Sequence, residues 1–139
     1  MANKMASDLT IRDIVVGDVK DVVEILTSRR VCEKRGLDAR LKSVIENPQG
    51  ICIVAEFDGR IVGVLLASYD GFHVFLGKIG VLKEYEGRGI GQALHAEMLS
   101  RGCELNMLGV IADSKLTATG FFYSLGYRMP GAVFLKYDS

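Results

Sequence analysis

Residues 86–94 read EGRGIGQAL, a glycine-rich stretch between a predicted strand and a predicted helix. Glycine is the least favourable helix residue after proline, yet three glycines stand directly before an apolar, alanine-containing run. A helix N-terminus leaves its first N–H groups unpaired and carries roughly half a positive charge, and glycines let a ligand approach the backbone closely. The stretch therefore predicts a site for a phosphate or pyrophosphate. Glycines that only shape a tight connection are the alternative.

Two well-known phosphate-binding motifs do not fit this stretch. A dinucleotide fingerprint requires G-x-G-x-x-G inside a βαβ unit, but the third glycine would fall on Gln92 or Leu94. A P-loop requires Gly-Lys followed by Ser or Thr, whereas Gly91 is followed by Gln92 and Ala93. The sequence thus points to a different kind of phosphate ligand.

The segments upstream of the glycines predict an antiparallel meander. Three stretches are rich in β-branched and aromatic residues: 51–57, 60–69 and 72–82. Two Asp-Gly pairs, Asp58-Gly59 and Asp70-Gly71, separate them, and such pairs are strong hairpin signals because the turn requires positive φ angles. The middle stretch is nearly continuous in apolar residues, which indicates that both faces of the sheet are covered.

The rest of the chain completes an α/β pattern. Asp18 is placed to cap a helix from Val19, and Gly36 to end that region. The other expected elements are a strand over 8–16, helices over 38–46 and 89–102, a strand over 107–113, a helix ending near Leu125, and a final strand pair that includes 132–138. The order β-α-α-β-β-β-α-β-α-β-β predicts one domain over 1–139, with a mixed, mostly antiparallel sheet and helices on both faces.

Composition narrows the function classes. The chain has 17 basic and 17 acidic residues and a formal net charge of zero, which argues against nucleic acid or an anionic membrane as the main partner. No apolar run approaches the roughly 18–20 residues of a membrane span, and the N-terminus lacks a signal-peptide core. The three cysteines show no CxxC spacing, so we expect no metal site or disulfide framework and a reduced, cytoplasmic protein.

The stretch GKIGVLKEYEGRGIGQAL (77–94) resembles the coenzyme-A loop of the GNAT (Gcn5-related N-acetyltransferase) superfamily. That loop reads Arg/Gln-x-x-Gly-x-Gly/Ala after a strand that ends in an apolar residue. Glu86, Gly89 and Gly91 fall on the three motif positions, and Val81 is the strand residue before the loop. Glu86 departs from the family pattern, because an acid there cannot help to bind phosphate. We expect its carboxylate to turn outward or to pair with Arg88 or Lys83.

A second family signature, roughly Ala-x-x-Phe-Tyr-x-x-x-Gly-Phe, is similar to ATGFFYSLGY (118–127). Ala118, Phe121, Gly126 and Tyr127 fall in register with it. Together the two motifs and the order of elements extend the resemblance over essentially the whole chain.

The resemblance implies transfer of an acyl group, most simply acetyl from acetyl-CoA, to the primary amine of a small molecule or of a protein or peptide, by direct attack. It implies pyrophosphate on the backbone N–H groups of 87–92 and pantetheine beside 79–81. The residues expected at the cofactor are Ile79, Gly80, Val81, Gly87, Arg88, Gly89, Ile90, Gly91, Gln92, Ser114 and Phe121. The chain would act as a monomer or homodimer. A CoA-binding domain with little catalysis is the alternative.

The family motifs identify the catalytic groups less directly than they identify the cofactor loop. The family's frequent general-acid tyrosine falls on Phe122, so Tyr123, the next residue, is the candidate acid. The glutamate base of the histone acetyltransferase branch falls on Phe75, and His73 remains a candidate base because its pKa class suits neutral pH. The family's CoA-contacting asparagine falls on Lys115.

Three further features concern the glycines of a strand, a histidine and a group of arginines. Gly77 and Gly80 interrupt a strand, which predicts a bulge that opens the sheet or two packing glycines. His95 lies off the apolar stripe of its helix, so we expect it on the surface. A cluster of arginines lies in the segment that borders the acceptor site in this family, either to favour an anionic acceptor or as a solvated face: Arg29, Arg30 and Arg35.

Overall fold

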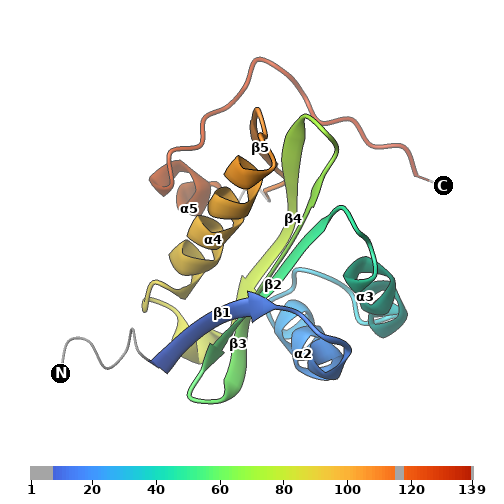
Figure 1. The fold of residues 1–139 in the computed structure, drawn as a ribbon, viewed down its shortest axis with the longest axis vertical. Coiled ribbons are helices and arrows are strands. Elements are labelled where there is room, and N and C mark those ends of the chain that lie inside the picture. Colours follow the sequence, from blue (N-terminus) through green and yellow to red (C-terminus); the bar gives the residue numbers. More distant parts are fainter. Residues whose placement is uncertain (1–7, 115–117, 139) are drawn as a thin grey trace.

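The computed structural model describes residues 8–114 and 118–138, and in them five strands form one sheet in the order β1-β2-β3-β4-β5 (Figure 1). Neighbouring strands run antiparallel except β4 and β5, which are parallel. The strands are β1 (Leu9–Asp13), β2 (Gly50–Phe57), β3 (Arg60–Tyr69), β4 (His73–Val81) and β5 (Gly109–Ala112). The expected fold class, a mixed and mostly antiparallel sheet with helices, is confirmed.

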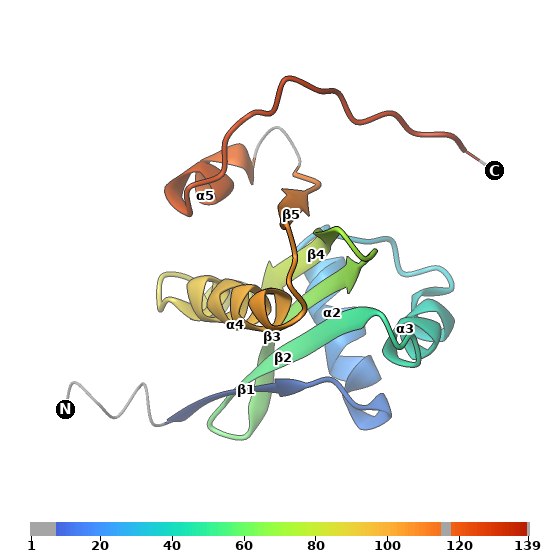
Figure 2. The same cartoon turned by 45° about the horizontal axis from the view of Figure 1, so that its top comes forward.

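Helices cover both faces of the sheet (Figures 1 and 2). A Cβ built on Gly63 would lie 3.1 Å from Leu94 in α4, whereas one on Gly80 would lie 3.2 Å from Ile25 in α2. Gly80 is paired with Val64, the neighbour of Gly63, so the two glycines face opposite sides of the sheet. The helices are α2 (Val19–Ser28), α3 (Leu37–Ile45), α4 (Ile90–Glu104) and α5 (Thr119–Ser124), with 3-10 turns η1 (Val16–Asp18) and η2 (Lys83–Tyr85).

The core lies between the sheet and these helices, and it contains the middle strand as expected. β3 has seven consecutive buried residues, because α2 and α4 press on its two faces. The largest fully buried side chains include Ile25, Leu26, Ile53, Leu65, Leu94 and Met98.

The two Asp-Gly turns form by different means. Asp58 and Gly59 both have positive φ angles, 52° and 78°, as a two-residue hairpin requires. At the second turn only Gly71 has a positive φ, and the Asp70 carboxylate instead accepts the backbone N–H groups of Phe72 and His73, each at 2.8 Å. The meander was therefore predicted correctly, although the second turn is held by a side chain.

α2 begins at Val19 with Asp18 at its N-cap position, as expected, but the expected capping by the Asp18 side chain and the expected role of Gly36 are wrong. Asp18 makes no side-chain cap to α2; its carboxylate accepts the N–H of Val15 at 2.9 Å and pairs with Arg12 at 2.8 Å. This pairing with the Arg12 guanidinium holds the pKa of Asp18 below its usual value. Gly36, in the left-handed conformation with φ 68°, precedes α3 instead of ending α2.

The expected final strand pair is absent from the described part of the tail. Residues 128–138 form no strand, and Val133, Leu135 and Tyr137 are at least 80% exposed. A strand needs a partner edge as well as β-prone residues, and the tail turns away at Pro130, whose carbonyl accepts the N–H of Ala132 at 2.7 Å. The segment passes over the end of the sheet in Figure 2.

Candidate active site

The site begins where β4 separates from β5. The parallel pairing of these strands ends at Leu76 and Ala112, and the N–H of Asp113 makes a last hydrogen bond to the Leu76 carbonyl at 3.2 Å. The next residue, Gly77, is the extra residue of a β-bulge against β3. Among the described residues, nothing pairs with the edge of β4 beyond this point, so its backbone is available to a ligand.

The bulge expected from the two glycines of β4 is confirmed at Gly77 and not at Gly80. Gly80 lies in regular pairing with Val64, and a side chain there would press on Ile25. Its small size therefore serves the packing of α2 on the sheet.

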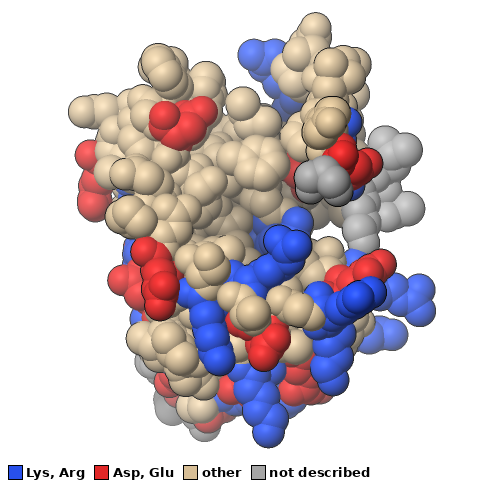
Figure 3. Space-filling model, turned by 90° about the vertical axis from the view of Figure 1, so that its right-hand side faces the viewer, with Lys and Arg blue, Asp and Glu red and all other residues tan. Residues whose placement is uncertain are grey.

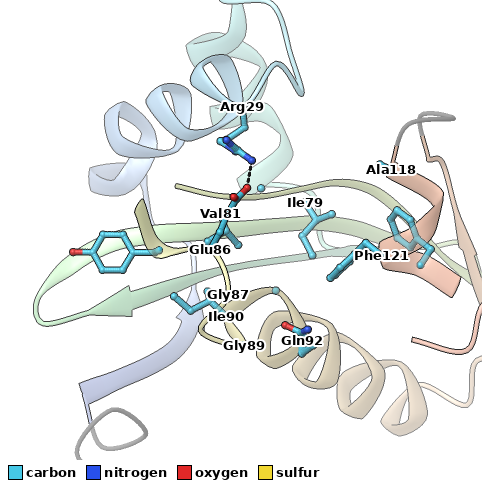
Figure 4. A pocket seen from close by; sticks show the side chains of 14 residues that line it. Arg29, Ile79, Val81, Glu86, Gly87, Gly89, Ile90, Gln92, Ala118 and Phe121 are labelled. Atoms are coloured by element: carbon cyan, nitrogen blue, oxygen red, sulfur yellow. Dashed lines mark hydrogen bonds and ion pairs between the residues drawn. The ribbon is translucent and has the colours of Figure 1, made fainter. Parts of the chain in front are cut away.

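A cleft of about 450 Å³ lies beside the open edge of β4 (Figure 4). This volume falls in the range of roughly 300–1,000 Å³ that is usual for small-molecule sites. Ile79 and Val81 form one wall, the glycine-rich loop and the start of α4 form another, and Phe121 of α5 closes one end.

Two of the glycines in the glycine-rich loop are explained by the backbone conformation there, and the third by close packing. Gly87 and Gly89 have φ angles of 76° and 79°, a region that side chains disfavour, and both would carry a Cβ into open space. Gly91 differs, because a Cβ there would lie 3.3 Å from the Phe121 ring. The first helical hydrogen bond of α4 runs from Ala93 to the carbonyl of Gly89 at 3.0 Å, so the N–H groups before Ala93 have no helical partner.

Glu86 lies on the cleft, paired with a residue far away in sequence. Its carboxylate accepts a hydrogen bond from the guanidinium of Arg29, which follows α2 (Figure 4). The expected pairing with Lys83 or Arg88 is wrong. Arg88 instead stacks over the rings of Tyr85 and Phe57, 4.9 and 5.6 Å from their centroids. The charges of Arg29 and Glu86 on the cleft thus offset one another, and the unpaired N–H groups at the start of α4 are the donors that an anion would meet there.

The fold brings most of the sequence-predicted cofactor residues to one cleft. The lining includes Ile79, Gly80, Val81, Gly87, Gly89, Ile90, Gly91, Gln92 and Phe121. Arg88 and Ser114 are not part of this lining, and Lys115 lies outside the described residues. Sequence reasoning missed the lining residues Tyr85 and Phe122, and it placed Arg29 at the acceptor side. Motif spacing cannot show such contacts between distant segments.

Neither candidate catalytic residue lines the cleft. Phe122 lines it and is buried, whereas Tyr123, one position along α5, is 49% exposed. His73 lies at the start of β4, opposite Gly109 of β5, four residues before the open edge begins at Gly77. The structure therefore places an apolar ring at the position where the family often has its acid.

His95 is buried, and its expected surface position is wrong. Its Nε2 forms a 2.8 Å hydrogen bond with the hydroxyl of Tyr127, and the Tyr127 ring packs edge-on against Phe122. Burial lowers the pKa of His95 and raises the pKa of Tyr127 to about 12, so both groups are neutral near pH 7. This contact fixes the segment after α5 against α4.

The sheet and the helices that cover it define a mixed α/β fold, and comparison with known proteins gives the family. The model of the acetyltransferase (GNAT) family matches residues 19–127. The chain therefore belongs to the GNAT acetyltransferase family.

Solved structures with low sequence identity share this fold. A possible acetyltransferase from Clostridium difficile 630 is 15% identical, with a TM-score of 0.81 over 94% of this chain and 97% of that one. Ribosomal-protein-alanine N-acetyltransferase from Brucella melitensis biovar Abortus 2308 is 15% identical, with a TM-score of 0.78 over 94% and 99%. Aminoglycoside N-acetyltransferase AAC(6')-Iy in complex with CoA is 18% identical, with a TM-score of 0.79 over 94% of both chains.

Proposed function

We propose that the chain is a single-domain N-acetyltransferase, spanning 1–139, that uses acetyl-CoA as co-substrate. The observation that carries the proposal is the cleft between the open edge of β4 and the start of α4. A strand edge offers backbone hydrogen bonds to a pantetheine amide, and a helix start offers N–H groups to a pyrophosphate. The complex of AAC(6')-Iy with CoA supports the choice of ligand, since that protein shares the fold.

The reaction proposed is direct transfer to a primary amine. The neutral amine attacks the thioester carbonyl, the new C–N bond forms, the C–S bond breaks, and CoA leaves as a thiolate. A backbone N–H of β4 near the carbonyl stabilises the oxyanion that develops. The amine loses one proton to a side chain or to water, and the thiolate takes one up. No covalent intermediate on the enzyme is needed.

Tyr123 and His73 stay proposals for the acid and the base. Replacement of Tyr123 by Phe removes the hydroxyl and keeps the ring. If Tyr123 donates the proton to the thiolate, kcat falls in this variant. A kcat that is unaltered across pH removes Tyr123 from the mechanism, and the same measurement with His73→Gln tests the base.

A CoA-binding domain with little catalysis is the second candidate. Phe122 at the acid position favours it. The cleft lining favours it too, because its only charged groups among the described residues are Arg29 and Glu86, which pair with each other. Two measurements separate the candidates. Calorimetric titration with acetyl-CoA tests binding, and thiol release over a panel of amines tests transfer. Binding without release on any amine supports the second candidate, and no binding at millimolar acetyl-CoA contradicts both.

The cellular setting follows from the same proposal. None of the helices in the described part of the chain is long and apolar enough to cross a membrane. We propose a cytoplasmic enzyme, because acetyl-CoA and amine acceptors are metabolites of that compartment. We also propose that the enzyme is monomeric or homodimeric.

A further inference from the structure

A second hollow, of about 240 Å³, lies on the side of β4 that faces α2 and α3. Its wall is apolar and comes from four elements: Leu26 of α2, Leu41 and Val44 of α3, Leu66 of β3 and Phe75 of β4. The volume is below the range of roughly 300–1,000 Å³ that suits drug-sized ligands. The hollow therefore fits one small apolar group.

Among the residues that the structure describes, two cations are the only charged groups in the lining of this hollow. Lys78 projects from β4 and Arg40 from α3, and neither forms an ion pair with any described residue. None of the described lining residues carries a carboxylate. Figure 3 shows this side of the molecule, with basic side chains in the middle of the face, an upper part that is mostly uncharged but carries some acidic and basic side chains, and a lower part of mixed charge. The hollow thus pairs an apolar wall with unneutralised positive charge.

The hollow and the cofactor cleft lie along consecutive residues of one strand. Gly77 and Lys78 line the hollow, and Ile79, Gly80 and Val81 line the cleft. The bulge at Gly77 marks the change from one to the other. A molecule in the hollow would therefore lie against the residues of β4 that directly precede those at the proposed thioester site.

We propose that the hollow binds the acceptor, and that the acceptor is a small amine with an apolar skeleton and a carboxylate, such as an apolar α-amino acid. This inference rests on the proposed function. The apolar side chain fills the hollow, and the carboxylate pairs with Lys78 and Arg40. The amino nitrogen then attacks the thioester, giving the N-acetyl amino acid and CoA, with the nitrogen's proton passing to the departing thiol.

The same charges act against other acceptors. A polyamine or an aminoglycoside carries several positive charges, and it would bring them to two cations in a lining whose described residues carry no carboxylate. Such a ligand would have to be desolvated against an apolar wall without a counter-charge, which is unfavourable. AAC(6')-Iy shares the fold and is an aminoglycoside N-acetyltransferase, so the fold alone does not choose the acceptor.

The test compares acceptors that differ in one group, with the full chain and saturating acetyl-CoA. L-Phenylalanine and L-leucine are compared with phenethylamine and isoamylamine, which lack only the carboxylate, and with spermidine and kanamycin. We expect kcat/KM for each amino acid to exceed that of its decarboxylated partner by about tenfold or more, the effect of a charged hydrogen bond. Lys78→Met combined with Arg40→Met should lower this ratio to within about twofold. Lys20→Met, on the exposed face of α2 and outside both cavities, should keep it.

A binding measurement keeps this test separate from catalysis. Cys32 lines the hollow and is half-buried, whereas Cys103 is exposed, so alkylation of Cys32 is followed in a Cys103→Ser background with CoA bound. L-Phenylalanine should slow the alkylation, and spermidine should not. Acetyl-CoA binding with no protection by L-phenylalanine would overturn the inference and leave the proposed function standing. Preferred acetylation of spermidine, kanamycin or a peptide N-terminus would also overturn the inference and leave the proposed function standing. Failure to bind acetyl-CoA would overturn the proposed function itself.

Discussion

The ion pair between Arg29 and Glu86 sets the charge of the cofactor cleft, and Glu86→Gln tests what it does. In the wild-type chain the two side chains bring a net charge of zero to the lining. The substitution removes the carboxylate, keeps the size of the side chain, and leaves the Arg29 guanidinium free to face a pyrophosphate. CoA should therefore bind more tightly to Glu86→Gln, and more weakly to Arg29→Gln, which leaves the Glu86 carboxylate unpaired.

The magnitude follows from Coulomb's law with solvent screening. Glu86 is half-exposed, so a water-like dielectric of about 80 applies. Two phosphate charges at about 8 Å from the carboxylate then give roughly 1 kcal/mol, or about a fivefold change in Kd at low salt. The Debye length is about 8 Å at physiological ionic strength, so more than half of the effect should disappear there. The double variant Arg29→Gln with Glu86→Gln should bind CoA nearly as the wild type does.

Calorimetric titration with CoA at low and at physiological salt checks these values. Glu84→Gln is the matched control, because Glu84 is an exposed acid two residues away that does not line the cleft. Its affinity should stay within about twofold of wild type, in keeping with a screened surface charge. If Glu86→Gln binds CoA no more tightly than wild type at low salt, or if the affinity of the double variant departs clearly from that of wild type, the phosphates do not lie beside this pair.

Two predictions concern the stability of the fold that holds the site. Burial lowers the pKa of His95 below its ordinary value of 6.5, so the unfolded chain takes up a proton first as the pH falls. The contribution of His95 to the free energy of unfolding should therefore be constant above about pH 7 and decline as the pH drops below 6.5. Denaturant titrations of His95→Gln should show a flatter decline than those of the wild type. An equal pH dependence in both proteins would contradict the lowered pKa of His95. Gly63→Val should lower the free energy of unfolding by about 1–3 kcal/mol, since its Cβ would lie 3.1 Å from Leu94 and 3.3 Å from Ala55. Thermal unfolding checks this against Gly17→Ala, whose Cβ would meet nothing within 4 Å, and equal melting temperatures for the two variants would refute the packing argument.

Local chemistry in the sequence was enough to predict the elements that carry the cleft. The Asp58-Gly59 turn fixes the first hairpin because both residues take positive φ angles, and the glycines at 87 and 89 stand where the backbone is left-handed. These features depend on residues that are neighbours in the chain, so a short stretch of sequence is enough to predict them. The bulge at Gly77 could be predicted from the sequence for the same reason.

Features that depend on contacts between distant segments could not be predicted from the sequence. Glu86 pairs with Arg29, 57 residues away, in preference to its neighbours in sequence. His95 was expected on the surface because its own helix is amphipathic, and the residue that buries it, Tyr127, belongs to the far end of the chain. The tail from 132 to 138 has the residues of a strand, but a strand forms only where an edge pairs with it. In each case the deciding partner lies on another element.

The binding of acetyl-CoA to the glycine-rich loop is the central claim, and calorimetric titration of Gly89→Trp tests it most directly. Gly59→Trp is the matched control, because Gly59 has nearly the same φ angle, 78° against 79°, and equally open surroundings, but lies in a turn that does not line the cleft. The two substitutions should impose similar backbone strain. We expect Gly89→Trp to abolish acetyl-CoA binding and Gly59→Trp to bind as wild type does. Unchanged affinity in a folded Gly89→Trp protein would contradict the placement of the cofactor.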